Sequence, residues 1–299
     1  MSEPMWKNGI IAVDWGTTNR RAWRLDRNGH SEAEFEDDQG ITAIKTGGFP
    51  AAVGDVRQRL GDLPLLMAGM IGSNRGWVEA PYVPCPSGPA ELARKLQQIP
   101  AERAAIVPGL SYHNGARADV MRGEEVQLFG AVAAGFSPPD ALVCHPGTHN
   151  KWAVLEGGRV TSFRTVMTGE MFSLLSKHSI LSQWLQTSVT VGEPFLAGVR
   201  QGMGGEALTA ELFSVRAGVL LGVREAHEAA SFTSGLLIGA DVRTGLAGAP
   251  DTGDVIVMGR PELTRLYAAA LAEAGREARE VDGERAFLAG IQALVKELP

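Results

Sequence analysis

The sequence predicts an α/β protein made of two halves that begin alike. In each half an apolar run leads into a short turn that contains Gly-Thr and then into a second strand-like run, at residues 9–25 and 141–155. The helix-breaking stretch Ser-Pro-Pro-Asp at 137–140 separates the halves. We therefore predict two domains, residues 1–137 and residues 138–299, each of which starts with a β-hairpin.

Size and composition are those of an ordinary soluble globular protein. The chain has 299 residues, of which 44% are hydrophobic and 21% charged. Its formal net charge of -6 argues against a protein whose main task is to bind nucleic acid, and no run is long enough to span a membrane. The two cysteines, Cys85 and Cys144, lack metal-type spacing, and no secretory signal is visible, so we expect a cytoplasmic protein.

Strands come first and a helix last in the first half. Residues 9–14 are apolar and β-branched, and residues 20–26 alternate in polarity, which indicates two strands. Asn28-Gly29 suits a hairpin turn, after which residues 31–36 continue the sheet. The other expected elements are a strand running into a glycine loop at 63–73, a helix at 88–99, a strand at 103–110 and a helix at 122–135.

The second half repeats the opening and then becomes mainly helical. Residues 141–160 have the pattern of three strands joined by two turns, and residues 170–232 are mostly helical. Residues 254–258 form a buried strand, followed by Gly259 and a helix with Pro261 in its first turn. Leu181, Trp184 and Leu185 are expected in the core.

The first Gly-Thr turn joins a strand to a strand, which argues against the common nucleotide-binding motifs. A P-loop or a dinucleotide-binding fingerprint needs a helix after the glycine turn. The chain contains no GxxxxGK[ST], and the GxGxxA match at 202–207 does not follow a clean strand. A different class of phosphate site is therefore indicated.

Five stretches together resemble the 2-dehydro-3-deoxygalactonokinase family, and the resemblance covers about residues 9–295. These stretches are DWGTTNRRAW, MAGMIGSNRGWVEAPY, ADVMRGEE, PGTHNKW and TGEMFSLLSKHSIL. The family shares the superfold of sugar kinases, actin and the heat-shock chaperone ATPases, so the resemblance implies two ribonuclease H-like (actin-like ATPase) domains flanking an ATP cleft. It also implies transfer of phosphate from ATP, with Mg²⁺, to the 6-hydroxyl of 2-dehydro-3-deoxy-D-galactonate in galactonate catabolism.

The resemblance implies that both turns bind the phosphates of ATP. Glycine lets backbone N–H groups approach phosphate, and threonine adds hydroxyl donors. Asp14 is expected to hold Mg²⁺ through water. The predicted nucleotide-binding residues are Gly16, Thr17, Thr18, Asn19, Gly147, Thr148 and His149 on the turns, with Gly239 and Gly259, each after an apolar run, receiving adenine and ribose. Plain hairpin turns are the alternative.

The second turn departs from the pattern of many sugar kinases, because Cys144-His145-Pro146 stands where an acidic residue is usual. A second carboxylate facing magnesium is therefore missing at that point. His145, His149 or Lys151 could contact phosphate there, or the histidines could be structural.

The sugar acid needs a base for its hydroxyl and partners for its carboxylate. The resemblance implies Asp119 as the base, with Glu124 a weaker candidate and a helix cap the alternative role for Asp119. An arginine can bind a carboxylate through two parallel hydrogen bonds, which suits Arg75 or Arg122. The predicted substrate-binding residues are Ser73, Asn74, Arg75, Trp77 and Arg122, while Thr168, Gly169 and Glu170 could approach the sugar or the metal.

Two other functions remain open at this point. One is a kinase of the same fold for another sugar or sugar acid, and the other is a non-catalytic nucleotide-binding regulator. Such a regulator often carries an added helix-turn-helix, for which the residues before the first strand leave no room. The expected partner is a small sugar acid, without nucleic acid or membrane, and a homodimer is one option for the assembly.

Overall fold

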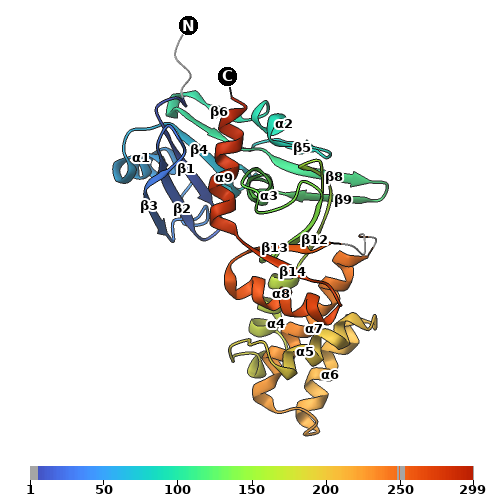
Figure 1. Ribbon diagram of the computed structural model, residues 1–299. Coiled ribbons are helices and arrows are strands. Elements are labelled where there is room, and N and C mark those ends of the chain that lie inside the picture. Colours follow the sequence, from blue (N-terminus) through green and yellow to red (C-terminus); the bar gives the residue numbers. More distant parts are fainter. Residues whose placement is uncertain (1–5, 248, 250–252, 299) are drawn as a thin grey trace. The chain divides into compact units, whose positions relative to one another are not determined.

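The structure is a computed structural model that describes residues 6–247, 249 and 253–298 (Figure 1). It divides into two compact units. Unit 1 consists of Met1–Pro139, Glu156–Ser162 and Glu284–Pro299, and unit 2 of Asp140–Leu155 and Phe163–Gly283. The boundary near residue 139 lies two residues from the predicted one, but the structure differs from the prediction in assigning 156–162 and 284–299 to unit 1.

Unit 1 is built on a six-stranded sheet in the order β3-β2-β1-β4-β7-β6. β1 pairs antiparallel with β2 and parallel with β4, so its carboxyl end meets the end of β4 at one edge of the sheet. The strands span Ile10–Trp15 (β1), Arg20–Leu25 (β2), Ser31–Asp37 (β3), Leu65–Gly69 (β4), Gln97–Ile99 (β6) and Ala104–Ile106 (β7). The predicted strands at 9–14, 20–26 and 31–36 are therefore confirmed.

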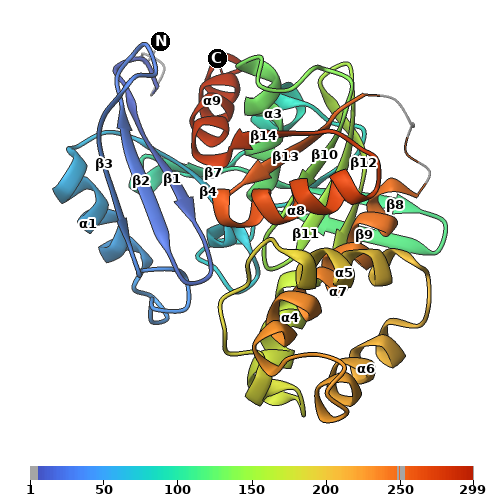
Figure 2. The same ribbon diagram turned by 60° about the horizontal axis from the view of Figure 1, so that its bottom comes forward.

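Helices cover both faces of this sheet, as Figure 2 shows for α1 on one side and α3 and α9 on the other. Side chains alternate between the faces of a strand, so Trp15 packs on Phe49 of α1 (Phe49–Leu60), with ring centroids 6.0 Å apart. On the opposite face Trp23 packs on Phe287 of α9 (Gly283–Lys296), with ring centroids 5.3 Å apart. The predicted helix at 122–135 is confirmed as α3 (Glu124–Ala133).

A second, three-stranded sheet extends unit 1, and the segment between β5 and β7 differs from its prediction. It consists of β5 (Tyr82–Pro84), β8 (Gly109–Asn114) and β9 (Arg117–Met121) in the order β5-β8-β9. The helix predicted over 88–99 is wrong beyond residue 93, because α2 spans only Pro89–Ala93 and residues 97–99 pair with β7 as strand β6. A short apolar stretch can form either a helix or a strand. Here residues 97–99 form a strand because they pair with β7.

Unit 2 repeats the hairpin of unit 1 in a five-stranded sheet of order β12-β11-β10-β13-β14. β10 pairs antiparallel with β11 and parallel with β13, as β1 does with β2 and β4. The strands span Ala141–His145 (β10), Asn150–Glu156 (β11), Arg159–Val166 (β12), Val255–Gly259 (β13) and Ala278–Asp282 (β14). The internal similarity between residues 9–25 and 141–155 is thus a repeat of topology.

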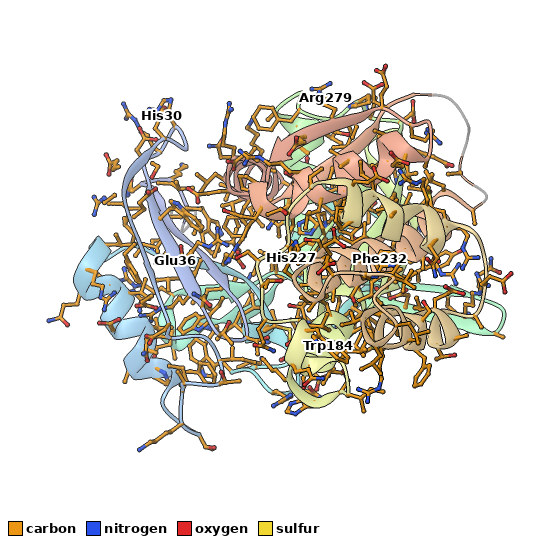
Figure 3. All side chains as sticks on the ribbon, turned by 90° about the horizontal axis from the view of Figure 1, so that it is seen from below. His30, Glu36, Trp184, His227, Phe232 and Arg279 are labelled. Atoms are coloured by element: carbon orange, nitrogen blue, oxygen red, sulfur yellow. The ribbon has the colours of Figure 1, made fainter. Side chains whose placement is uncertain are left out.

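The helices of unit 2 are α4 (Thr168–His178), α5 (Glu193–Met203), α6 (Leu208–Leu220), α7 (Ala229–Leu246) and α8 (Pro261–Glu273). The mainly helical character predicted for 170–232 and the helix start at Pro261 are confirmed. Leu181 and Leu185 are buried and Trp184 packs against their cluster, which also contains Phe232 (Figure 3). None of the helices in the described ranges is both long and apolar enough to cross a membrane.

Glycines allow α5 and α7 to pack with their backbones close together. A β-carbon at Gly198 or Gly202 of α5 would lie 2.2 Å from a carbonyl oxygen of α7. A β-carbon at Gly239 of α7 would likewise lie 2.2 Å from the carbonyl oxygen of Val199. Gly239, which was predicted to receive the nucleotide after an apolar run, lies inside a buried helix, where its lack of a side chain is used for helix packing.

Candidate functional site

The first Gly-Thr turn is a tight and well-supported loop between β1 and β2. Gly16 donates its N–H to the carbonyl of Asn19 at 2.9 Å, which closes the turn. Thr17, Thr18 and Asn19 are exposed, and the hydroxyl of Thr18 donates to the Asn19 side chain at 2.9 Å. The turn thus presents two hydroxyls and an amide to its surroundings.

The loop at 39–42 forms hydrogen bonds to the backbone of the first turn. Backbone N–H groups of Gly40, Ile41 and Thr42 donate to the carbonyls of Thr18, Gly16 and Thr17 at 3.0–3.2 Å. These bonds occupy carbonyl oxygens of the turn. Its backbone conformation is therefore fixed by neighbours more than 20 residues away in sequence.

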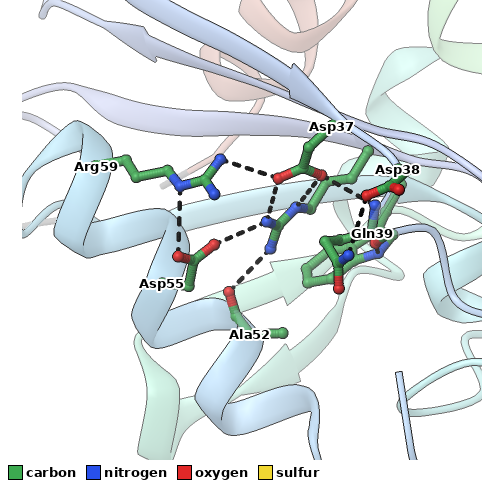
Figure 4. A network of polar contacts seen from close by, with 8 residues as sticks. Asp37, Asp38, Gln39, Ala52, Asp55 and Arg59 are labelled. Carbon is green, nitrogen blue, oxygen red and sulfur yellow. Dashed lines mark hydrogen bonds and ion pairs between the residues drawn. The ribbon is translucent and has the colours of Figure 1, made fainter. Parts of the chain in front are cut away.

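A buried arginine anchors the strand that leaves the first turn. Arg20 is 1% exposed and bonds Asp37, Asp55 and the Ala52 carbonyl, and Arg59 bonds Asp37 as well (Figure 4). Burial alone would raise the pKa of the Asp37 carboxyl, but the hydrogen bonds and charges of the arginines outweigh it and lower that pKa. The network holds β2, β3 and α1 together through Arg20, the residue that directly follows the turn.

Asp14 lies at the carboxyl end of β1, where three segments of unit 1 meet. A β-carbon at Gly69, the last residue of β4, would lie 3.4 Å from Oδ1 of Asp14 and 2.8 Å from the Trp15 carbonyl. A β-carbon at Gly123 would lie 3.2 Å from the Cα of Gly69. Gly69 and Gly123 both have φ near +100°, which favours glycine. The start of α3 is therefore brought next to Asp14.

Arg122, directly before Gly123, is buried, and two of its guanidinium nitrogens have no hydrogen-bond partner among the described residues. It is 8% exposed, its Nη2 donates to the Ala80 carbonyl at 2.8 Å, and its guanidinium lies 4.3 Å from the ring centroid of Tyr82. Within the described residues neither Nε nor Nη1 has a hydrogen-bond partner. Nη1 would be 3.0 Å from a β-carbon at Gly72. Buried polar groups are normally paired, so this arginine has the property expected of an anion-binding residue.

The loop at 73–79 divides into structural and exposed side chains. Ser73 is buried and donates its hydroxyl to the Met70 carbonyl at 2.7 Å. Trp77 stacks on Phe49 with centroids 6.2 Å apart and packs against the core of unit 1. Asn74 and Arg75 are exposed. Ser73 and Trp77 thus have structural contacts, whereas Asn74, Arg75 and also Glu79 are exposed to solvent.

Asp119 and Glu124 occupy different surroundings. Asp119 lies in β9 opposite Tyr112, two residues before the strand ends, and accepts the Val120 N–H at 2.8 Å. Glu124 is the first residue of α3 and accepts the Arg122 N–H at 3.1 Å. Gly123 packs on Gly69, so the backbone of Glu124, the next residue, lies near the carboxyl ends of β1 and β4.

Glu125, the second residue of α3, is a buried carboxyl. It is fully buried, and both of its oxygens accept the Gly123 N–H, at 2.8 and 2.7 Å. Burial, reinforced by the neighbouring Glu124 charge, raises the pKa of Glu125 to about 8. At neutral pH this carboxyl is therefore largely protonated, and it holds the backbone between Arg122 and Glu124.

The second Gly-Thr turn, like the first, exposes its threonine, but its asparagine is buried where Asn19 is exposed. Thr148 and His149 are exposed, and Asn150, which follows them, is fully buried. The start of α4 packs directly on this turn, since a β-carbon at Gly169 would lie 2.5 Å from the Gly147 carbonyl, and Glu170 donates its N–H to the Thr148 carbonyl at 2.9 Å. The side chains of His149 and Glu170 are 2.6 Å apart.

An apolar cavity of about 350 Å³ adjoins the second turn inside unit 2. Its walls come from the turn, from α4, from the loop before α5, and from α7 and α8. Gly259 lies at the end of β13, where a β-carbon would be 3.4 Å from the Pro146 carbonyl. The lining residues are Gly147, Thr168, Gly169, Phe172, Val189, Ser234, Leu237, Ile238, Glu262, Leu263, Leu266 and Tyr267. Such a cavity suits a flat apolar ring with a few polar groups.

Comparisons with known proteins agree with this arrangement. A family model described as 2-keto-3-deoxy-galactonokinase matches residues 14–294. The chain belongs to this family. The predicted family resemblance is confirmed, and with it the class of protein, a sugar-acid kinase family on the actin-like ATPase fold.

Relatives match along almost the whole chain. The probable 2-dehydro-3-deoxygalactonokinase DgoK1 of Rhizobium meliloti is 39% identical and covers 96% of both chains. The 2-dehydro-3-deoxygalactonokinase of Escherichia coli is 36% identical and covers 95% of this chain and 96% of its own length.

Solved structures extend the likeness to the fold. A crystal structure from Sinorhizobium meliloti, assigned provisionally as a 2-dehydro-3-deoxygalactonokinase, superposes with a TM-score of 0.90 at 37% identity, covering 96% of this chain and 98% of that one. Component A of (R)-2-hydroxyglutaryl-CoA dehydratase from Acidaminococcus fermentans superposes with a TM-score of 0.54 at 14% identity, covering 97% and 99% of the two chains. The second likeness concerns the fold alone.

Proposed function

We propose that this chain is an ATP-dependent kinase that phosphorylates the 6-hydroxyl of 2-dehydro-3-deoxy-D-galactonate in galactonate catabolism. Membership of the kinase family over residues 14–294 supports the reaction class. The observation that carries recognition of a sugar acid is Arg122, a buried guanidinium with two donors that no described residue accepts. An ionised carboxylate is a strong acceptor for such buried, charged donors.

In this proposal ATP contacts both turns. Gly16, Thr17, Thr18 and Asn19 offer phosphate ligands in unit 1, and Gly147, Thr148 and His149 offer them in unit 2. Phosphoryl transfer depends mainly on positioning and on neutralising charge, which backbone N–H groups and hydroxyls at a glycine turn can do. The apolar cavity beside Gly147 and Gly259 receives the adenosine, a role that we assign to this cavity in place of Gly239.

Asp14 would hold Mg²⁺ through water in the same proposal. Magnesium keeps several waters and is usually bound by one or two carboxylates together with substrate phosphates. A single carboxylate at the end of β1, beside the first turn, fits that requirement. When bound, the ion neutralises phosphate charge.

The chemical step transfers the γ-phosphoryl group to the sugar acid. A bond forms between the 6-oxygen and the γ-phosphorus, the bond from that phosphorus to the β,γ-bridging oxygen breaks, and the hydroxyl proton passes to a carboxylate. Asp119 is the predicted base, and Glu124 is the alternative that the packing of Gly123 on Gly69 favours. Arg122 orients the substrate through its carboxylate.

One assay tests the substrate assignment. Coupled ADP release is measured with purified protein across 2-dehydro-3-deoxy-D-galactonate, its C4 epimer 2-dehydro-3-deoxy-D-gluconate, and the corresponding sugar alcohol without a carboxylate. We expect the highest kcat/KM with the galactonate and little release with the alcohol. Equal rates with acid and alcohol would contradict the carboxylate role of Arg122, and no release with any acid would contradict the proposed function.

A further inference from the structure

A carboxylate is buried in the middle of α7, away from both turns in sequence. Asp241 is 1% exposed, and its two oxygens accept hydrogen bonds from four side chains. Asn150 and Trp152 donate at 3.0 and 2.7 Å, and Tyr267 and Thr168 donate their hydroxyls to Oδ2. All four donors are neutral groups, so their dipoles surround the carboxylate.

Burying such a group is costly unless its hydrogen bonds are made. Burial raises the pKa of Asp241, and the four hydrogen bonds act against that rise. The packing of α7 on α5 does not need a carboxylate at this position, because close glycine contacts already account for it. The four hydrogen-bond donors are therefore the contacts that account for a carboxylate at position 241.

Those donors come from the elements that surround the second turn and the cavity. Asn150 is the residue that directly follows the turn at 146–149, and Trp152 follows on the same strand. Thr168 begins α4, whose next residue packs on Gly147, and Tyr267 belongs to α8. Thr168 and Tyr267 both line the cavity. Figure 2 shows α4, α7 and α8 of unit 2 next to one another, consistent with this meeting point.

We propose that Asp241 is a positioning residue for nucleotide binding. Its carboxylate fixes the positions of the second turn, the start of α4 and Tyr267, which lines the cavity, relative to one another. ATP contacts these groups, while Asp241 itself stays buried and does not touch the nucleotide. The inference rests on the proposed function only in taking the turn and the cavity as the ATP site. It follows that loss of the carboxylate weakens binding of ATP selectively and leaves recognition of the sugar acid unchanged.

The test compares Asp241→Asn with a matched buried substitution. We expect Asp241→Asn to raise KM for ATP about 10-fold, as the loss of a charge-assisted network implies, with KM for the sugar acid within about two-fold of wild type. Calorimetric titration with the non-hydrolysable analogue AMP-PNP, without sugar acid, should show the same loss of affinity. Thr264→Val is the control, since Thr264 is 2% exposed on α8, bonds Glu280, and does not line the cavity.

Two further variants keep the test decisive if Asp241→Asn does not fold. Tyr267→Phe and Thr168→Val each remove one donor, and both should weaken AMP-PNP binding several-fold at a melting temperature no lower than that of Thr264→Val. Unchanged AMP-PNP affinity in all three network variants would overturn the proposal, as would an equal rise of both KM values. Wild type that binds AMP-PNP but turns over no sugar acid would instead refute the proposed function and leave the Asp241 comparison intact.

Discussion

Arg122 shows how a single residue can carry specificity. Its guanidinium is held by the Ala80 carbonyl and the Tyr82 ring, which lie about 40 residues earlier in the chain, and this fixes where its two remaining donors point. Arg75, the other predicted carboxylate partner, is exposed. A preorganised donor pair loses less entropy on binding than an exposed side chain does, so Arg122 is the stronger candidate.

We predict that Arg122→Ala raises KM for the sugar acid about 10-fold or more and leaves KM for ATP nearly unchanged, since a charge-assisted hydrogen bond is worth about 1.5–3 kcal/mol. Steady-state kinetics with each substrate varied in turn measures this. Arg75→Ala should have a smaller effect in the same direction. Arg94→Ala, at an arginine that is 67% exposed and pairs with Glu91, is the control and should change neither constant.

A pair of substitutions decides which carboxylate is the base. Asp119→Asn is predicted to lower kcat by roughly 10² or more with nucleotide binding intact, because a positioned base contributes about 10²–10⁴ in rate. If Glu124 is the base, Glu124→Gln shows that loss and Asp119→Asn stays within a few-fold of wild type. Single-turnover rates with saturating ATP separate the two, and full activity in both variants would place the base elsewhere.

Glu125 gives a prediction about pH. Its folded pKa of about 8 lies above the ordinary value of 4.5, so the folded protein keeps a proton that the unfolded chain has lost between these values. The stability that Glu125 contributes is therefore fully present below about pH 4.5 and is lost as pH rises through about 8.

Glu125→Gln, which keeps an acceptor for the Gly123 N–H, should remove this loss. The melting temperature of the variant relative to wild type is expected to rise steadily from pH 5 to pH 8. Glu91→Gln is the control of opposite sign, because the pKa of Glu91 is lowered and the difference it makes should be constant over that range. A pH-independent difference for Glu125→Gln would show that Glu125 is ionised in the folded state.

At the scale of elements, the α5–α7 pair explains two glycines in residues 235–245, a stretch that shows only an apolar run in the sequence. Of the three glycines in the apolar run GLLIGADVRTG, Gly235 and Gly239 are spaced four apart and face α5. Helix packing of this kind depends on a partner helix about 40 residues away. Local patterns do not contain that partner, so the helix could be recognised only once both were placed.

Gly239→Ala is expected to lower the free energy of unfolding by about 1–3 kcal/mol, because the added methyl meets the Val199 carbonyl and the helices must separate. Gly54→Ala is the matched control: Gly54 lies inside α1 with open space around it, and alanine there should stabilise by roughly 0.5–1 kcal/mol. Urea denaturation measures both. A stable Gly239→Ala with raised KM for ATP would restore Gly239 as a nucleotide contact.

At the scale of the whole molecule, the end of the chain belongs with its beginning. The segment 284–299 is part of unit 1, where Phe287 packs on Trp23 and Gly290 lies close against Val126 of α3. The apolar side of α9 could pack on any exposed apolar surface, so the sequence of α9 alone does not specify that it packs on the sheet of unit 1. The proposed homodimer stays a prediction, which the mass in solution tests.

Phe287→Ala should lower the free energy of unfolding by about 3–5 kcal/mol, since it empties a fully buried ring position. The loss should be local to unit 1. Hydrogen exchange is expected to quicken in β1–β3 while β10, β11 and β13 of unit 2 keep their protection. Lys296→Ala, at an exposed position of the same helix, is the control, and a uniform loss of protection would show that the two units unfold together.

The sequence by itself determined the two hairpins with their Gly-Thr turns, the strands beside them, a helix within residues 122–135, the helix start near Pro261, and a family resemblance that the comparisons confirm. These features depend on neighbours along the chain, through side-chain alternation, turn geometry and helix-start chemistry. Only the tertiary structure decided that Asp14, Gly69 and Gly123 meet, that Arg122 keeps two donor nitrogens without a partner among the described residues, and that Asp241 accepts hydrogen bonds from groups up to 91 residues away from it. Burial and hydrogen-bond partnership are set by which distant segments pack together, and no local pattern encodes that.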